Sequence, residues 1–139
     1  MPKTTSQPLK IIFDSNALFI PVELKIDIFE ELRRLLNRNV ECILIYPVKA
    51  ELEMLANKKS YKLRRQANFA LKLSEKCELV SVTVPDKLTT DDSIVKVAKD
   101  WNSPVFTNDG QLRKRLRDIS LPVIYVRQKS RLEIDGLIS

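Results

Sequence analysis

Four carboxylates stand at equivalent places along the chain, at or just beyond the ends of expected buried strands. Asp14 closes one short apolar run, and Asp109 follows another. Glu51 and Asp92 fall in the first turns of helices that follow two further strands. A lone buried carboxylate is costly, so Asp14 requires a cation, hydrogen-bond donors or water beside it. Carboxylates are ligands that Mg²⁺ and Mn²⁺ prefer, and such an ion would activate water for attack on a phosphodiester.

The residue types that the chain lacks also favour carboxylate and metal chemistry. There is no histidine, which excludes Ser-His-Asp triads, histidine general bases and histidine-bound zinc. The only glycines are Gly110 and Gly136, so neither a P-loop nor a G-x-G-x-x-G dinucleotide loop is present. Any hydrolytic chemistry therefore rests on carboxylates, and Mg²⁺ or Mn²⁺ is the expected cofactor.

The elements that position these acids alternate between strands and helices. Strands are predicted over residues 9–13, 40–46, 78–84, 105–107 and 121–126, with a short edge strand near 132–134. Helices are predicted over 22–38, from Pro47, over about 61–76, after an N-cap at Thr90, and from 108–110 onward. Before them, Asn16 is expected to cap a short helical segment that Pro21 interrupts.

This order predicts an α/β domain, a three-layer sandwich with a largely parallel sheet of about five strands. In a parallel sheet all strand-to-helix junctions lie on the same edge, so the four acids can meet there although they are far apart in sequence. Ligands of open α/β sheets bind at that edge. The 139 residues form one domain: a flexible tail (1–8), a core (9–126) and a basic, then apolar, C-terminal tail (127–139) that belongs to the same domain.

Composition and cysteine usage indicate a cytoplasmic protein. No apolar run has the length of a membrane helix, and residues 1–8 lack the apolar core of a signal peptide. Cys42 and Cys77 lie in or beside apolar runs without paired spacing, and we expect two free thiols that fill the core in a reducing compartment. The net charge of +6 favours a polyanionic partner.

Every acid except Asp14, which closes a buried strand, also has a structural explanation. Asp91 and Asp92 follow the expected N-cap Thr90, and the helix dipole favours acids in a first turn; Asp91 is expected to be the more purely structural of the two. Asp109 suits a turn or an N-cap, and Glu51 a solvated helix face. The combination of positions is what favours a metal site.

Four segments in this order resemble the motifs of the PIN domain, a small metal-dependent ribonuclease fold related to the flap endonucleases. They are Ile11-Ile12-Phe13-Asp14-Ser15-Asn16, Pro47-Val48-Lys49-Ala50-Glu51-Leu52, Asp92-Ser93-Ile94-Val95-Lys96-Val97-Ala98 and Thr107-Asn108-Asp109. The resemblance covers about residues 9–126. It implies that the catalytic, metal-binding acids are Asp14, Glu51, Asp92 and Asp109. It implies supporting polar groups at Ser15, Asn16, Asp91 and Thr107.

Within that family the chain looks most like the ribosomal-RNA-processing branch. The likeness lies in the paired acids of 90–95, the strongly basic helix after 107–109, and Pro-Val-Ile-Tyr at 122–125. The expected substrate is therefore RNA, single-stranded or a structured ribosomal precursor. The basic residues expected to contact its phosphates are Lys58, Lys59, Lys62, Arg64, Arg65, Arg113, Lys114, Arg115, Arg117, Arg127, Lys129 and Arg131.

Several alternatives remain open. Toxin nucleases of toxin–antitoxin pairs share all four acids, and such a protein would have a small protein inhibitor. A non-catalytic RNA-binding PIN module would keep the fold alone. The family also suggests a homodimer, with the apolar tail 132–138 as its surface. A receiver domain would need an acid after the third strand, where Val84 and Pro85 stand, and a haloacid-dehalogenase-type phosphatase a second Asp at position 16.

Overall fold

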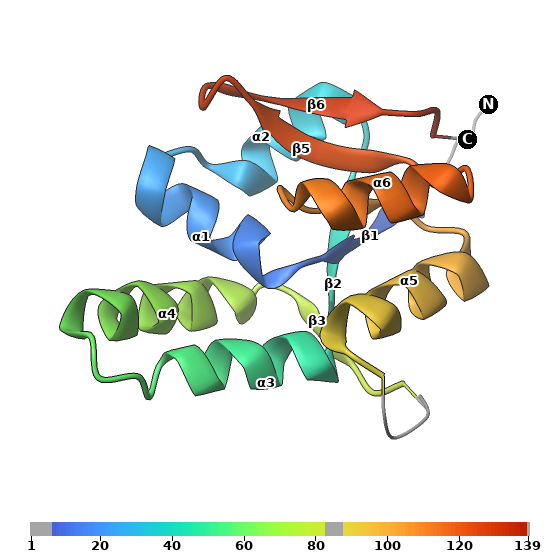
Figure 1. Ribbon diagram of the computed structural model, residues 1–139. Helices are drawn as coiled ribbons and strands as arrows, with labels where there is room; N and C mark the ends of the chain where they lie inside the picture. Colours follow the sequence, from blue (N-terminus) through green and yellow to red (C-terminus); the bar gives the residue numbers. More distant parts are fainter. Residues whose placement is uncertain (1–6, 83–87, 139) are drawn as a thin grey trace.

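A computed structural model describes residues 7–82 and 88–138, which form a sheet with helices packed around it (Figure 1). The strands are β1 (Leu9–Phe13), β2 (Val40–Ile45), β3 (Glu78–Val80), β4 (Val105–Phe106), β5 (Val123–Arg127) and β6 (Arg131–Asp135). The helices are α1 (Ser15–Leu24), α2 (Ile28–Leu36), α3 (Tyr46–Leu55), α4 (Tyr61–Ser74), α5 (Thr90–Trp101) and α6 (Gly110–Asp118). The predicted α/β class with a largely parallel sheet is confirmed.

The order of the strands is β3-β2-β1-β4-β5-β6, and all neighbouring pairs are parallel except β5 and β6. From β1 the chain moves outward to β2 and β3, then crosses back to β4 on the other side of β1. Because such crossovers are right-handed, α1 to α4 cover one face and α5 and α6 the other (Figure 1). The strand order therefore reverses between β1 and β4, and the ends of these two strands form the topological switch point.

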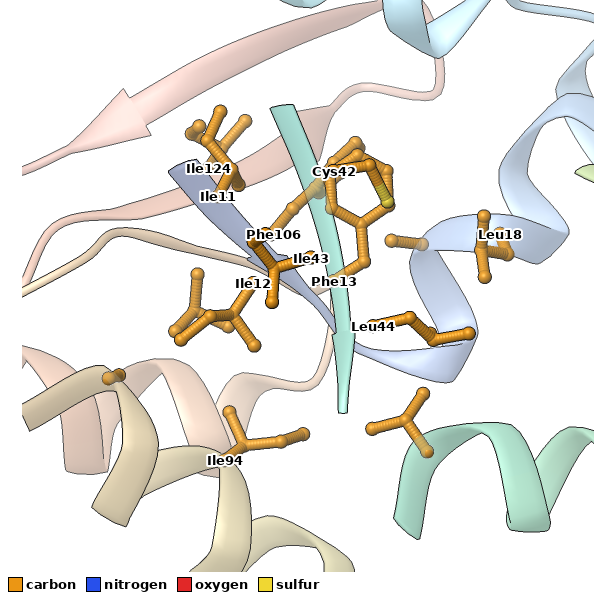
Figure 2. Packing of buried hydrophobic residues seen from close by; sticks show 14 of the residues in the cluster. Ile11, Ile12, Phe13, Leu18, Cys42, Ile43, Leu44, Ile94, Phe106 and Ile124 are labelled. Atoms are coloured by element: carbon orange, nitrogen blue, oxygen red, sulfur yellow. The ribbon is translucent and has the colours of Figure 1, made fainter. Parts of the chain in front are cut away.

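The core is built on β1, whose last three residues, Ile11, Ile12 and Phe13, are fully buried. Figure 2 shows them among the buried side chains of β2, β4 and β5 and of the flanking helices. The ring of Phe13 meets Phe106 of β4 edge to face, with 5.2 Å between centroids, and stacks on Phe29 of α2 at 5.9 Å. This close packing fixes the end of β1, from which Asp14 emerges.

The first helices differ from the prediction at both ends. Asp14, not Asn16, is the N-cap of α1, and the helix continues through Pro21 to Leu24. Lys25 then adopts a left-handed conformation and ends it. Asp27 caps a separate helix, α2, so the single predicted helix over 22–38 was wrong. The apolar spacing of 22–38 matched one helix because the break between the two is short.

Helix α5 also starts one residue earlier than predicted. Thr89, not Thr90, is the N-cap, and it forms a capping box with Asp92. The described part of the predicted strand 78–84 is paired only over Glu78–Val80. Residues 83 and 84 of that strand, and Asp86 and Lys87 of the predicted loop, lie outside the described residues.

The prediction of two free cysteines was wrong, because Cys42 and Cys77 form a disulfide. Ile43 of β2 pairs with Glu78 of β3 in parallel register, which sets the preceding residues, the two cysteines, side by side. The bond therefore joins β2 to the beginning of the edge strand β3. Their separation of 35 residues hides this neighbourhood from the sequence.

The C-terminal tail adds a sixth strand, β6, which pairs antiparallel with β5. Leu132 is buried, and Ile134 and Ile138 pack against the core, so the tail predicted as a dimer surface contributes most of its apolar side chains to its own domain. None of the described helices has the length and apolar character that a membrane crossing requires.

Candidate active site

Asp14 lies at the switch point with only 4% of its surface exposed, and both of its carboxylate oxygens accept hydrogen bonds. One oxygen, Oδ1, accepts the backbone N–H of Ser15 at 2.8 Å. The other, Oδ2, accepts the hydroxyl of Thr107 at 2.8 Å and the side-chain amide of Asn16 at 3.0 Å. Two of these donors lie at the start of α1, directly after β1, and the third directly follows β4, so together they hold the carboxylate in one orientation.

A small polar network fixes the turn after β4 against the turn after β1. The Thr107 hydroxyl oxygen accepts the backbone N–H of Asp109 at 3.0 Å, and Asn16 Oδ1 accepts that of Asn108 at 2.9 Å. Asn108, which the sequence did not single out, uses its own Oδ1 to accept the N–H of Val126 at 2.8 Å. Its signal was present as a polar residue after a buried strand, but it pointed equally well to a simple turn.

Glu51 reaches the same place from α3, on the side of β2. The Ser15 hydroxyl, next to Asp14, donates to Glu51 Oε1 at 2.5 Å. This bond joins the beginning of α1 to the second turn of α3. Ser15 is thus a bridge between two of the predicted acids, and it is itself 8% exposed.

The two acids of α5 have opposite surroundings. Asp92 accepts the guanidinium of Arg115 at 2.9 Å and the N–H of Thr89 at 3.3 Å, and these bonds hold its pKa below the ordinary value. Burial and then the charges of Asp109 and Glu51 raise the pKa of Asp91. Asp92 is therefore engaged by Arg115, whereas the pKa of Asp91 responds to the charges of the other acids.

Asp109 caps α6, where its Oδ1 accepts the N–H of Gln111 at 2.8 Å and of Leu112 at 3.0 Å. Both N–H groups bond to Oδ1 and neither bonds to Oδ2. The carboxylate is also close enough to Asp91 for its charge to raise the pKa of Asp91. Asp109 is consequently both a structural cap and a member of the acidic edge.

We define the acidic edge as Asp14, Glu51, Asp91 and Asp109, and the pKa is raised at two of these acids, Asp14 and Asp91. Burial raises the pKa of Asp14 to about 6; the charges of Asp91 and Glu51 add to this, while the bonds from Thr107 and Ser15 oppose it. Negative charge is therefore unfavourable here in the absence of a cation. Within residues 7–82 and 88–138, however, no three acidic or cysteine side chains are already arranged as a metal-binding cage.

The predicted basic contacts fall into two groups. On one side, Arg113 and Arg117 pair with Asp135, Arg115 with Asp92, and Arg127 and Arg131 with Glu133. Among the described residues no such ion pair involves the cations at the start of α4 or in the turn before it. Those cations are Lys58, Lys59, Lys62, Arg64 and Arg65. Lys114 and Lys129 are exposed and likewise lack an ion pair in the described part.

Fold and site together define an open α/β domain with an acidic site at the switch point of its sheet. A family model described as PIN like domain matches residues 11–129, and the chain belongs to that family. Ribonuclease VapC4 of Methanocaldococcus jannaschii is 34% identical over 132 residues, which are 93% of this chain and 98% of the relative. Ribonuclease VapC9 of Archaeoglobus fulgidus is 28% identical over 126 residues, 91% and 89% of the two chains.

Solved structures agree with this assignment. The PIN domain endonuclease Utp24 superposes with a TM-score of 0.78 and 28% identity, covering 94% of both chains. VapBC2 from Rickettsia felis, bound to a DNA fragment from its promoter, matches with a TM-score of 0.61 at 16% identity, over 86% of this chain and all of that one. The second likeness shows the fold alone.

Proposed function

We propose that the protein is a metal-dependent endoribonuclease that hydrolyses RNA phosphodiesters. The observation that carries the proposal is the buried Asp14 at the switch point, with Glu51 and Asp91 close enough to raise its pKa. Ligands of open α/β sheets bind at such a point. Two relatives that span nearly the whole chain are named ribonucleases, and the similar Utp24 is named an endonuclease.

The side chains at this edge fit a hard divalent ion. All of the candidate ligands are carboxylate oxygens, and Mg²⁺ commonly uses one or two protein carboxylates and keeps several waters. A preformed cage of three acids is therefore not required, and the raised pKa of Asp14 marks a place where a cation would relieve repulsion. Mg²⁺ or Mn²⁺ bound there would supply a water of lowered pKa and stabilise charge on the phosphodiester.

We propose Asp14, Glu51, Asp91 and Asp109 as the residues that would hold the ion. Asp91 replaces Asp92, which the sequence favoured, because Asp92 is engaged by Arg115 and Thr89 while Asp91 is coupled to the other acids. Asp92 is then a positioning residue, which fixes the start of α5 through its capping box with Thr89.

The polar neighbours would hold these acids in place. The Thr107 hydroxyl and the Asn16 amide orient Asp14 through Oδ2, and Ser15 orients Glu51. Each donates a hydrogen bond to the charged form of a carboxylate and so holds that carboxylate in an orientation from which it can bind a cation. Their loss is expected to weaken metal binding by about 10- to 100-fold, as is usual for residues that support a metal ligand.

The experiment is cleavage of labelled RNA with Mn²⁺ by the wild-type protein and by Asp14→Asn. A matched control is Asp100→Asn, which removes an exposed carboxylate of α5 whose one ion pair among the described residues is with Lys96. The proposal expects cleavage to disappear in Asp14→Asn and to persist in Asp100→Asn. Calorimetric titration with Mn²⁺ gives a second readout: a wild-type protein that binds no Mn²⁺ would leave only an RNA-binding role.

For the biological role we favour processing of ribosomal RNA precursors. The support is the similarity to Utp24 over 94% of the chain at 28% identity, together with the basic α6 and the Pro-Val-Ile-Tyr segment at 122–125. Crosslinking of the protein to RNA in its native cell and sequencing of the bound species tests this role. Recovery of ribosomal precursor sequence is the expected result.

A toxin-type nuclease is the second candidate, favoured by the 34% identity to VapC4 over 98% of that relative. It would be controlled by a small inhibitor protein and is expected to act as a homodimer. Expression without the inhibitor should arrest growth, and a short reading frame should lie beside the gene. For either role we propose that the protein acts on RNA in the cytoplasm.

A further inference from the structure

The exposed face of α4 combines aromatic rings with cations and contains no acid. Tyr61, Lys62, Arg65, Gln66 and Phe69 follow helical spacing, so they lie along one stripe of the helix. Together with Val22 of α1 they line a groove of about 380 Å³. We call these six residues the α4 groove. Tyr61 is 68% exposed and Phe69 is 49% exposed, so two large aromatic side chains lie open to solvent in this groove.

The cations of the α4 groove are free to bind a ligand. Neither Lys62 nor Arg65 takes part in an ion pair among the described residues, and α4 itself contains no Asp or Glu. Arg64, on the neighbouring face, donates to the carbonyl oxygens of Lys58 and Lys59 at 3.4 Å and lies 5.8 Å from the centre of the Tyr61 ring. The local charge is therefore positive, and no ion pair among residues 7–82 and 88–138 neutralises it.

We propose that the α4 groove binds the single-stranded part of the RNA substrate, with bases stacked on Tyr61 and Phe69 and phosphates on Lys62 and Arg65. This inference rests on the proposed function and names a substrate site for it. Aromatic rings set among cations are the usual way in which proteins hold single strands without reading their sequence. The charge of the groove is complementary to a phosphodiester backbone and unfavourable for a basic protein segment.

The position of the groove suits a strand that also reaches the acidic edge. Val22 lies on α1 eight residues after Asp14, which is roughly 12 Å along the helix axis. α4 packs against both α1 and α3, the helices that begin beside Asp14 and carry Glu51 (Figure 1). A strand held in the groove would therefore place a phosphodiester a few nucleotides away at the acids.

The test is binding of a fluorescent single-stranded oligonucleotide to Asp14→Asn protein in EDTA, measured by anisotropy. Tyr61→Ala and Phe69→Ala should each weaken binding by about 5- to 100-fold, the usual effect of removing one stacking ring. Tyr61→Phe keeps the ring and should bind like the parent. Ile119→Ala removes an apolar side chain of similar exposure at the far end of α6 and should have no effect.

The cations give an independent readout. The double change Lys62→Ala and Arg65→Ala should flatten the plot of log affinity against log salt concentration by about 1.4, or about 0.7 for each lost phosphate contact. Irradiation of RNA that contains 5-iodouridine should crosslink a peptide with Tyr61 or Phe69. Unchanged affinity in both alanine variants, or crosslinks confined to other helices, overturns the inference and assigns this face to a protein partner.

Failure of this inference is distinguishable from failure of the proposed function. If Asp14→Asn abolishes cleavage while the α4 variants bind RNA normally, the nuclease stands and the α4 groove is not its substrate site. If Asp14→Asn cleaves like the wild type, the proposed catalytic site fails whatever the α4 variants do.

Discussion

The two sides of the acidic edge are both rich in basic residues, yet they use them differently. On the α3–α4 side, Lys62 and Arg65 have no ion pair within the described residues. On the side of α5, α6 and the β5–β6 hairpin, Arg113, Arg115 and Arg117 are held by acids of α5 and β6. A cluster of basic residues therefore does not by itself identify a binding surface. The acids that already pair with those residues must be located first.

The two sides are also held together by different bonds. On the α3–α4 side a disulfide joins β2 to β3, the strands that flank these helices in sequence. On the other side, Arg113 and Arg117 tie α6 to Asp135 of β6. Reductant and salt should therefore act on different halves of the same domain.

The largest effect is expected from the two acids of α5, which divide between the sides. Asp91→Asn should lower the rate of RNA cleavage by at least about 100-fold, since it removes a proposed metal ligand. Asp92→Asn should lower it by less than about threefold, because only an exposed ion pair and a cap contact are lost. Single-turnover assays with saturating Mn²⁺ measure both. The reverse order would return the metal site to Asp92.

Reduction of the disulfide should lower the free energy of unfolding by about 2 to 4 kcal/mol, the usual range for such a cross-link. Urea denaturation with and without dithiothreitol measures the loss, and Cys42→Ala/Cys77→Ala should reproduce it in the absence of reductant. High salt, in contrast, should weaken the α6–β6 side and leave the difference between oxidised and reduced protein unchanged. Equal stability of both forms would show that β3 is held by its packing.

Asp14, at the seam between the sides, should make the metal-free protein less stable as the pH rises. Its folded pKa of about 6 lies above the ordinary 3.8, so the folded state binds more protons between these values. Stability from this group is greatest below pH 4, is lost up to pH 6 and is constant above it. The shift corresponds to about 3 kcal/mol.

Urea denaturation in EDTA at several pH values tests this for the wild type and Asp14→Asn. The difference in stability between the two proteins should change by up to about 3 kcal/mol across that interval, in favour of Asp14→Asn at high pH. Mn²⁺ added at neutral pH should stabilise the wild type only. Parallel profiles would mean that the carboxylate is better solvated than its burial suggests.

The smallest effect on RNA binding is expected from releasing the two arginines that pair with Asp135. Asp135→Asn should free Arg113 and Arg117 and steepen the salt dependence of RNA binding by up to about 1.4, if both then reach phosphates. Asp118→Asn is the matched control, because Asp118 lies on α6 with these arginines and has no ion pair in the described part of the chain. An unchanged slope would place these arginines away from the RNA path and sharpen the contrast with the α4 groove.

The sequence predicted the alternation of strands and helices because buried strands and amphipathic helices each have a clear period. It also predicted that Asp14, Glu51 and Asp109 belong to strand-to-helix junctions, where the structure has them. The choice of Asp92 over Asp91 as a candidate metal ligand had a weaker basis. It rested on the resemblance of the segment that begins at Asp92, and neighbouring residues on a helix point about 100° apart, so the sequence alone did not show which of the two acids has Glu51 and Asp109 near it.

The disulfide and the ion pairs could not be predicted for a related reason. Cys42 and Cys77 become neighbours only through the register of β2 and β3, and no local pattern encodes that register. Arg113 and Arg117 look like free cations until β6 brings Asp135 beside them. Residue types and local patterns could be interpreted from the sequence, whereas the pairings between distant segments depended on the assembled sheet.

The two edges of the sheet have a consequence for how copies of this protein can meet. β3 has three residues, and β6 carries Arg131, Glu133 and Asp135 at alternate positions. A short strand and a charged one both discourage edge-to-edge pairing, the route by which exposed strands recruit further strands and aggregate. A crowded solution of this domain should therefore resist fibre-like growth, and a second copy would have to approach through the helices.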